Sequence, residues 1–254
     1  MAARTQEALV VDRFGAQARA YLTSPVHARG ADLAALAALA DGQAQALDLG
    51  CGGGHVAYAV APRVGHIVAY DLSEEMLAVV AETAVQRGLG NVSTRQGPAE
   101  RLPFDDAAFD LVLSRFSAHH WRDFEAGLRE AARVLKPGAP AGFVDAVSPG
   151  RAVLDTYLQS VEVLRDTSHV RDRSGAEWQD ALARAGFDVG AVSHFRLRMD
   201  FPTWTARMRT PPAMVAAIRA VQAAMSVEVQ RHFAIEADGS FMLDVALFAA
   251  RRAA

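Results

Sequence analysis

Short apolar runs alternate with helical patterns between residues 44 and 146, and this alternation constrains the fold more than any other feature. Five runs are typical of strands: 44–49, 66–70, 92–96, 109–114 and 141–146. Helices are predicted between them, two of which begin after the N-cap residues Ser73 and Asp123. Strands joined by helices form a parallel sheet that is covered on both faces, which explains why these strands are almost continuously apolar.

After residue 150 the alternation of predicted strands and helices becomes less regular, but both kinds of element continue. Helices are predicted over 152–164, 176–185 and from 211 to about 233, and long strands over 189–201 and 241–250. Two further helices, 12–22 and 28–40, precede the first strand. Because no Gly/Ser/Pro-rich linker interrupts the chain, the last strands are expected to complete the same sheet. We therefore predict an α/β fold with one doubly wound, mostly parallel, seven-stranded sheet in a single domain spanning 1–254.

Charge and cysteine content exclude several classes of function. The formal net charge is −3, whereas nucleic-acid binding needs clustered Lys and Arg. The single cysteine, Cys51, excludes an intrachain disulfide and a cysteine-rich metal site. The first residues lack the uninterrupted apolar stretch of a secretory signal, and no run is long enough to span a membrane. A cytoplasmic protein is expected.

A glycine cluster follows the first strand. Glycines at 50, 52 and 54 allow a tight turn and a close approach to a ligand, as in dinucleotide-binding loops. The dinucleotide fingerprint, however, needs a glycine at the position of His55. Asp48 lies just before the loop, where its carboxylate would repel a pyrophosphate and attract a cationic amino-acid ligand. The loop thus favours a sulfonium cofactor over a nicotinamide dinucleotide.

Asp71 ends the second strand and is a candidate for ribose binding. A carboxylate at this place accepts hydrogen bonds from both hydroxyls of an adenosine ribose. The alternative is that Asp71 is only a turn or N-cap residue. Its place at the carboxyl end of the strand favours the ligand role.

Five sequence motifs, taken in their order along the chain, resemble those of a known enzyme family. They are Asp-Leu-Gly-Cys-Gly-Gly-Gly at 48–54, Tyr-Asp-Leu-Ser-Glu-Glu-Met-Leu at 70–77, Gly-Pro-Ala-Glu-Arg-Leu-Pro-Phe at 97–104, Phe-Asp-Leu-Val at 109–112 and Arg-Val-Leu-Lys-Pro-Gly at 133–138. Together they resemble the class I S-adenosylmethionine-dependent methyltransferases of the type-11 group, relatives of the ubiquinone/menaquinone C-methyltransferases. The resemblance implies a Rossmann-like sheet with a helical lid over 1–40 and a cofactor-binding core over 41–150. Residues 151–254 would add substrate-pocket insertions and the last strands.

The resemblance also assigns residues to the cofactor, S-adenosyl-L-methionine. Gly50 and Gly52 would pack under its methionine part, with Asp48 behind the ammonium group through water. Asp71 would hold the ribose.

Further assignments concern the adenine and the methyl end. Leu72 would lie against the adenine, Ala99 would donate its backbone N–H to a ring nitrogen, and Ser114 would face the methionine end. The chain departs from the family at Pro98, where an Asp usually reads the adenine amino group. Proline offers no side-chain acceptor, so either Glu100 or water would serve that group.

Three histidines are candidate bases. His119 and His120 follow the fourth strand, near the ligand-binding edge of a doubly wound sheet, and His27 lies in the expected lid. A base is needed only where the nucleophile is a hydroxyl or an acidic carbon, and each histidine has a packing or capping role as its alternative. No carboxylate–histidine spacing is typical of a metal site, and no metal is predicted.

The predicted function is methyl transfer to an oxygen or carbon of a small molecule. The aromatic and methionine content of 150–235 favours an apolar or aromatic metabolite, although core packing explains it equally well. The alternative is an S-adenosylmethionine-binding regulatory or interaction protein without transferase activity. The oligomeric state stays open, a homodimer included.

Overall fold

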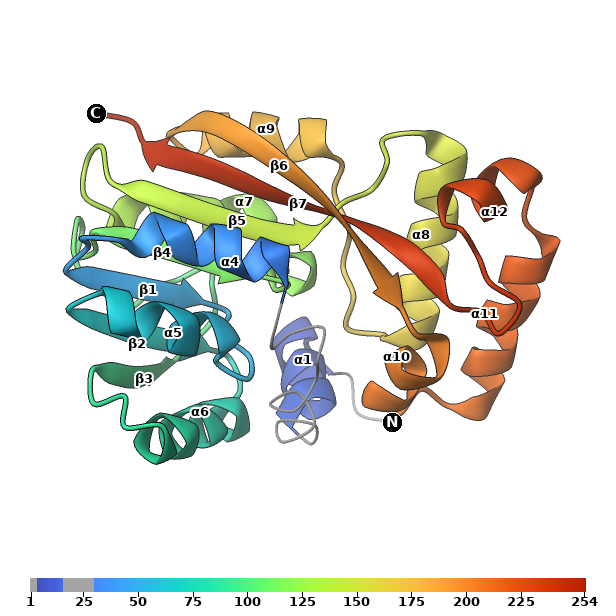
Figure 1. Ribbon diagram of the computed structural model, residues 1–254, viewed down its shortest axis with the longest axis horizontal. Helices are drawn as coiled ribbons and strands as arrows, with labels where there is room; N and C mark the ends of the chain where they lie inside the picture. Colours follow the sequence, from blue (N-terminus) through green and yellow to red (C-terminus); the bar gives the residue numbers. More distant parts are fainter. Residues whose placement is uncertain (1–3, 16–29) are drawn as a thin grey trace.

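The computed structural model describes residues 4–15 and 30–254, and its centre is a seven-stranded sheet in the order β3-β2-β1-β4-β5-β7-β6 (Figure 1). The strands are β1 Gln45–Leu49, β2 His66–Asp71, β3 Val92–Gln96, β4 Leu111–Arg115, β5 Pro140–Ala146, β6 Phe187–Met199 and β7 Phe241–Arg252. The first five are parallel, and β7 runs antiparallel to both β5 and β6. The predicted mostly parallel, seven-stranded sheet is confirmed.

Helices connect the strands, and two of them begin after the predicted capping residues Ser73 and Asp123. Their bounds are α1 Gln6–Gly15, α4 Ala31–Ala37, α5 His55–Val60, α6 Glu74–Gln86, α7 Phe124–Val134, α8 Ala152–Arg165, α9 Gly175–Arg184, α10 Phe201–Arg207, α11 Pro212–Ala224 and α12 Val227–His232. The Ser73 hydroxyl accepts the Met76 N–H at 3.2 Å, and the Asp123 carboxylate accepts the Ala126 N–H at 2.9 Å. Each bond satisfies one of the free amides of a first helical turn.

Successive strand residues point to opposite faces of the sheet and enter two separate cores. Ala46, Leu111 and Leu113 pack with the apolar faces of α4, α5 and α6. Leu47 and Val112 pack on the other face with α7 and α9. All five residues are fully buried, so the continuous apolar runs of the sequence are explained by burial on both faces.

The antiparallel strands β6 and β7 extend past the rest of the sheet and carry a second group of helices (Figure 1). Helices α8, α10, α11 and α12 lie around its far end. The region 211–233, predicted as one helical stretch, is divided into α11 and α12, because the Ser226 side chain caps a new helix by accepting the Val229 N–H. Strand β6 likewise ends before residue 201, since Asp200 caps α10.

The N-terminal part differs from the predicted bounds. Helix α1 begins at Gln6 rather than at residue 12, and α4 with the following 3-10 turn covers 31–40. His27 lies outside the described residues. Within the parts of the chain that are described, no helix combines the length and apolar character needed to cross a bilayer.

Candidate active site

Two neighbouring cavities lie at the carboxyl edge of the parallel strands. The strand order changes direction between β1 and β4, which is where a doubly wound sheet opens a crevice for ligands. The larger cavity lies there and has a volume of about 1040 Å³, with its opening to solvent included. Its wall comes from residues 48–53, 70–72, 97–100, 115–117 and 120–122, together with side chains of α1, α5 and α6.

The glycine loop forms the floor of the larger cavity. Its first amides, those of Gly50 and Cys51, both donate to the carbonyl of Tyr70, at 2.8 and 2.9 Å, which fixes the loop against β2. Gly50 has a φ of 73°, and a Cβ there would lie 1.8 Å from the Ser117 hydroxyl oxygen. Gly52 also has a positive φ, 48°, but its missing side chain would meet only open space. The loop therefore packs tightly at Gly50 and leaves room for a ligand at Gly52.

Asp48 is a buried carboxylate with one oxygen unused. Its Oδ2 accepts the Ala57 N–H at 3.0 Å, whereas Oδ1 has no hydrogen-bond partner among the described residues. Burial, more than the nearby charge of Asp71, raises the pKa of Asp48 to about 7. A buried oxygen without a donor is costly, so this atom is suited to a cationic or hydrogen-bond-donating ligand.

Asp71 stands at the end of β2 on the wall of the larger cavity. Its Oδ2 accepts the Gly52 N–H at 2.8 Å and its Oδ1 accepts the Ser73 N–H at 2.9 Å. Burial raises the pKa of Asp71, whereas the hydrogen bonds from these two amides lower it; the effect of burial is the larger. Because each carboxylate oxygen has a second lone pair, both remain able to accept a ligand hydroxyl. The two amides hold the carboxylate in one orientation.

The predicted adenine-side residues all line the same cavity. Leu72, Pro98, Ala99 and Glu100 follow the ends of β2 and β3. The Pro98 carbonyl accepts the Tyr70 hydroxyl at 3.1 Å, so the backbone here is anchored to β2. One Glu100 oxygen already accepts a backbone N–H, at 3.1 Å, from the start of α7.

Ser114 lies apart from the other predicted cofactor residues. It is buried in β4, its hydroxyl has no hydrogen-bond partner among the described residues, and it is not part of the cavity wall. The next residues, Arg115, Phe116 and Ser117, line the cavity instead.

The smaller cavity adjoins the larger one and shares three side chains with it. Phe14, Phe116 and His120 line both. The smaller cavity has a volume of about 560 Å³, again with its opening included. Its remaining wall combines apolar and ionisable side chains: His119, Ala146, Glu162, Arg165, Asp172, Met199, Trp204, Arg207 and Leu243.

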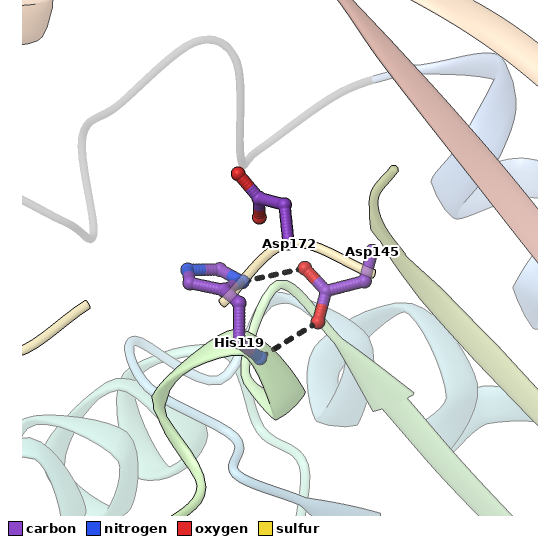
Figure 2. Close-up of side chains that lie close together, drawn as sticks. All are labelled: His119, Asp145 and Asp172. Carbon is purple, nitrogen blue, oxygen red and sulfur yellow. Dashed lines mark hydrogen bonds and ion pairs between the residues drawn. The ribbon is translucent and has the colours of Figure 1, made fainter. Parts of the chain in front are cut away.

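His119 forms a dyad with Asp145 at the edge of the smaller cavity (Figure 2). Its Nδ1 lies 2.6 Å from Asp145 Oδ1, and its backbone N–H donates to Oδ2 of the same carboxylate at 3.2 Å. Burial alone would lower the pKa of His119, but the charge and hydrogen bond of Asp145 outweigh burial and raise that pKa to about 9. With Nδ1 donating to Asp145, Nε2 is the atom that gains or loses a proton.

His120 is in a different electrostatic state from its neighbour. Its ring packs on Phe14 at 4.8 Å and on His119 at 4.2 Å between centroids. Burial, together with the charge of His119, lowers the pKa of His120 to about 4. His120 is therefore a neutral wall residue between the two cavities.

His119, Asp145 and Asp172 also lie close enough together for a metal-ligand arrangement, with one possible ligand atom from each within 4.8 Å of the others. The Asp145 oxygens, however, already accept three protein donors, two from His119 and the Ala146 N–H at 2.9 Å. A cation bound to Asp145 would compete with these donors, and one bound to His119 Nδ1 would replace the hydrogen bond to Asp145. The arrangement is better suited to orienting an imidazole, and the absence of a metal stays a prediction.

Several residues of this site were not singled out from the sequence, among them Asp145, Arg115 and Asp172. Asp145 had a usable signal, because it is a lone carboxylate in the apolar strand β5. Arg115 and Asp172 had none, since surface arginines and loop aspartates are common. Asp172 is 1% exposed, and its Oδ2 has no hydrogen-bond partner within the described part of the chain.

Comparison with known proteins places the chain in a family. Residues 47–141 match the family described as "Methyltransferase domain". An uncharacterized protein of Escherichia coli, YafE, is 49% identical over 201 residues, which cover 79% of this chain and 97% of YafE. A demethylmenaquinone methyltransferase of Chlorobaculum tepidum is 36% identical to this chain over 109 residues, which cover 42% of this chain and 43% of that protein.

The YcgJ protein of Bacillus subtilis is similar in both sequence and structure. It is described as an uncharacterized methyltransferase and is 36% identical over 200 residues, which cover 78% of this chain and 79% of YcgJ. Its crystal structure aligns with a TM-score of 0.84 and 32% identity, covering 88% of this chain and 98% of the other. These matches confirm the family indicated by the five motifs. The chain therefore belongs to the methyltransferase family and is an S-adenosylmethionine-dependent methyltransferase.

Proposed function

We propose that the larger cavity binds S-adenosylmethionine and that the smaller cavity binds a small-molecule acceptor, which is methylated on an oxygen or a carbon. The two cavities share Phe14, Phe116 and His120 in their walls, so a bound donor and a bound acceptor would be neighbours at these three side chains. Transfer from a sulfonium is an in-line displacement, for which holding donor and acceptor close and aligned supplies much of the catalysis.

The chemistry of the larger cavity suits this cofactor, which supplies an electrophilic methyl group when bound. The unused oxygen of Asp48 is available to an ammonium group, directly or through water. The open space at Gly52 admits a ligand close to the backbone. Asp71, oriented by two amides, offers an acceptor to each ribose hydroxyl.

The smaller cavity suits an acceptor with an apolar or aromatic body and at least one polar group. Phe14, Phe116, Trp204 and other apolar side chains supply the contact area. Glu162 and Arg165 pair with each other at 3.5 Å, whereas Asp172 Oδ2 has no hydrogen-bond partner among the described residues. An acceptor that displaces water from this cavity is therefore expected to offer a polar group to Asp172.

His119 is proposed as the base that removes the acceptor's proton. Asp145 holds Nδ1–H, so neutral His119 presents Nε2 as a proton acceptor (Figure 2 shows this nitrogen on the far side of the ring from Asp145). Because the pKa of His119 is about 9, only a small fraction is neutral at pH 7, and turnover should rise with pH toward that value. The His119–Asp145 dyad beside the cofactor cavity is the observation that carries this proposal.

The experiment uses S-adenosylmethionine labelled in its methyl group and a metabolite extract enriched in hydroxylated and quinone-like compounds. Label transfer and formation of S-adenosylhomocysteine are followed by mass spectrometry, which also identifies the acceptor. His119→Ala should then lower turnover by about a hundredfold or more while cofactor affinity stays nearly unchanged. The matched control is His194→Ala, at an exposed position on β6, which should not affect turnover.

Two results would count against the proposal. Turnover of His119→Ala within about threefold of wild type would place the base elsewhere, with His27 and His120 as the next candidates. Loss of stability and cofactor binding together would show that His119 is a packing residue.

A further inference from the structure

A buried carboxyl group in the wall of the smaller cavity, that of Asp172, is fixed in place through its backbone. The Asp172 N–H donates to Gln159 Oε1 on α8 at 3.1 Å, and Gln159 Nε2 donates to the Asp172 carbonyl at 2.7 Å. The side chain is buried, and its Oδ2 has no hydrogen-bond partner within the described ranges 4–15 and 30–254. The fold therefore determines where this carboxyl group lies and leaves one of its oxygens for another partner.

Keeping Asp172 in this state is unfavourable for the folded protein. Burial and the charge of Glu162 both disfavour its ionised form and raise the pKa of Asp172, and the charge of His119 offsets only part of that effect. A buried polar atom costs free energy unless some group supplies its hydrogen bond. Because Asp172 lies in a cavity wall, a ligand in that cavity is the group that can supply it.

Asp172 and His119 offer two hydrogen-bonding atoms to the same part of the smaller cavity. Both residues line it, and a carboxylate oxygen of Asp172 lies within 4.8 Å of a ring nitrogen of His119 (Figure 2). Neutral His119 accepts one hydrogen at Nε2, and the Asp172 carboxylate accepts another at Oδ2. A single hydroxyl has only one hydrogen, which it gives to His119. The acceptor therefore needs a second donor, and the short separation requires the two donors to be close together.

The apolar part of the wall indicates what kind of molecule carries these donors. Three aromatic rings line the smaller cavity from different segments: Phe14 from α1, Phe116 after β4 and Trp204 from α10. A flat ring can bury its faces and edges against them. An aromatic ring also holds two neighbouring hydroxyls in one plane, so that little conformational freedom is lost when both donate to fixed protein atoms.

We propose that the acceptor is an aromatic compound with hydroxyls on two neighbouring carbons, of which one is methylated while the other donates to Asp172. In the transfer step the first hydroxyl gives its proton to Nε2 of His119, and its oxygen forms a bond to the methyl carbon. The bond from that carbon to the sulfonium sulfur breaks, and its electron pair stays on the sulfur. This inference rests on the proposed function, because it needs the cofactor in the larger cavity and His119 as the base.

The test compares three probes that share one ring system: naphthalene-2,3-diol, 3-methoxy-2-naphthol and 2-naphthol. Each has a hydroxyl that can be methylated, but only the diol has a second donor beside it. Transfer of the label from methyl-labelled S-adenosylmethionine is followed by mass spectrometry. Wild-type protein should favour the diol over the other two probes by about ten- to a hundredfold in kcat/KM, the effect of one charge-assisted hydrogen bond.

Asp172→Ala should reduce this preference until the three kcat/KM values agree within about threefold. Asp172 also raises the pKa of His119, but all three probes give their proton to the same base, so a change in that base affects them alike. Should Asp172→Ala fail to fold, Asp172→Asn keeps the size of the side chain and should lower the preference by about threefold or more, since its acceptor is uncharged. Asp188→Ala, at an exposed position on β6, is the matched control and should keep the wild-type preference.

Several results would overturn the role of Asp172. Equal use of the three probes by wild-type protein is one, and a preference that survives Asp172→Ala is another. A preference that EDTA abolishes and Mg²⁺ restores is a third, because neighbouring hydroxyls chelate metal ions and the preference would belong to a cation held by His119, Asp145 and Asp172.

The same experiment separates this inference from the proposed function. Methylation of an acceptor in the metabolite extract without turnover of any probe would overturn the inference and leave the proposed methyl transfer standing. Absence of turnover with both the probes and the extract would instead refute the proposed function.

Discussion

Replacing Asp145 with Asn should change the protonation of His119 more than any other single substitution. The negative charge of Asp145 and its 2.6 Å hydrogen bond are what raise the pKa of His119 against the effect of burial. Asparagine keeps the size of the side chain and removes the charge. Burial then dominates, and the pKa of His119 should fall below its ordinary value of about 6.5.

The structure gives the size of the effect. Since each factor of ten in a protonation equilibrium is worth about 1.4 kcal/mol, a rise from 6.5 to about 9 favours the imidazolium by about 3 kcal/mol. The pKa of the folded state lies above that of the unfolded state. This contribution to folding is therefore fully present below about pH 6.5 and is lost as the pH rises through 9. In Asp145→Asn it should be absent.

Proton NMR of the histidine Cε1–H signals against pH measures the effect directly, with the His119 signal identified as the one missing from His119→Ala. Urea unfolding at pH 6 and pH 9.5 measures the linked stability. Asp172→Asn is the matched control, because Asp172 raises the pKa of His119 through its charge alone and its loss should lower that pKa less. A wild-type His119 that titrates near 6.5, or one that titrates alike in Asp145→Asn, would refute the reasoning.

Two further predictions concern cofactor binding. Asp71→Ala removes the proposed acceptor of both ribose hydroxyls, so calorimetry should show an affinity for S-adenosylmethionine lowered by about tenfold or more, with circular dichroism unchanged. Unchanged binding would show that Asp71 does not hold the ribose. Pro98→Asp is expected to add an acceptor for the adenine amino group and to tighten binding by ~1 kcal/mol. The loop should keep its position, because the Tyr70 hydroxyl donates to the backbone carbonyl of residue 98, which the substitution retains. Weaker binding in Pro98→Asp would show instead that the loop is shaped around proline.

The fold could be predicted because its signals are local. Apolar runs, the Ser73 and Asp123 caps and the glycine loop each act within a few residues, and they fix the order of strands and helices between 44 and 146. The region 211–233 was harder, since only the Ser226 cap separates two stretches of similar helical character.

The candidate site likewise contains residues that local sequence motifs predict and residues that only the fold brings together. Asp48 and Asp71 belong to motifs that are contiguous in sequence, whereas Asp145 meets His119 only because β5 pairs with β4 in the sheet. The contrast between Ser114 and Arg115 depends on strand register, because neighbouring residues of a strand point to opposite faces. Sequence alone places the strand end at the site without deciding which of the two side chains reaches it.

A crystal structure of the protein with S-adenosylhomocysteine would test the central claim most directly. We predict that the product lies in the larger cavity, with its ribose hydroxyls on Asp71, its amino-acid end at Asp48, and its sulfur toward the boundary formed by Phe14, Phe116 and His120. A product whose sulfur is directed away from this boundary, or whose ribose lies away from Asp71, would contradict the account.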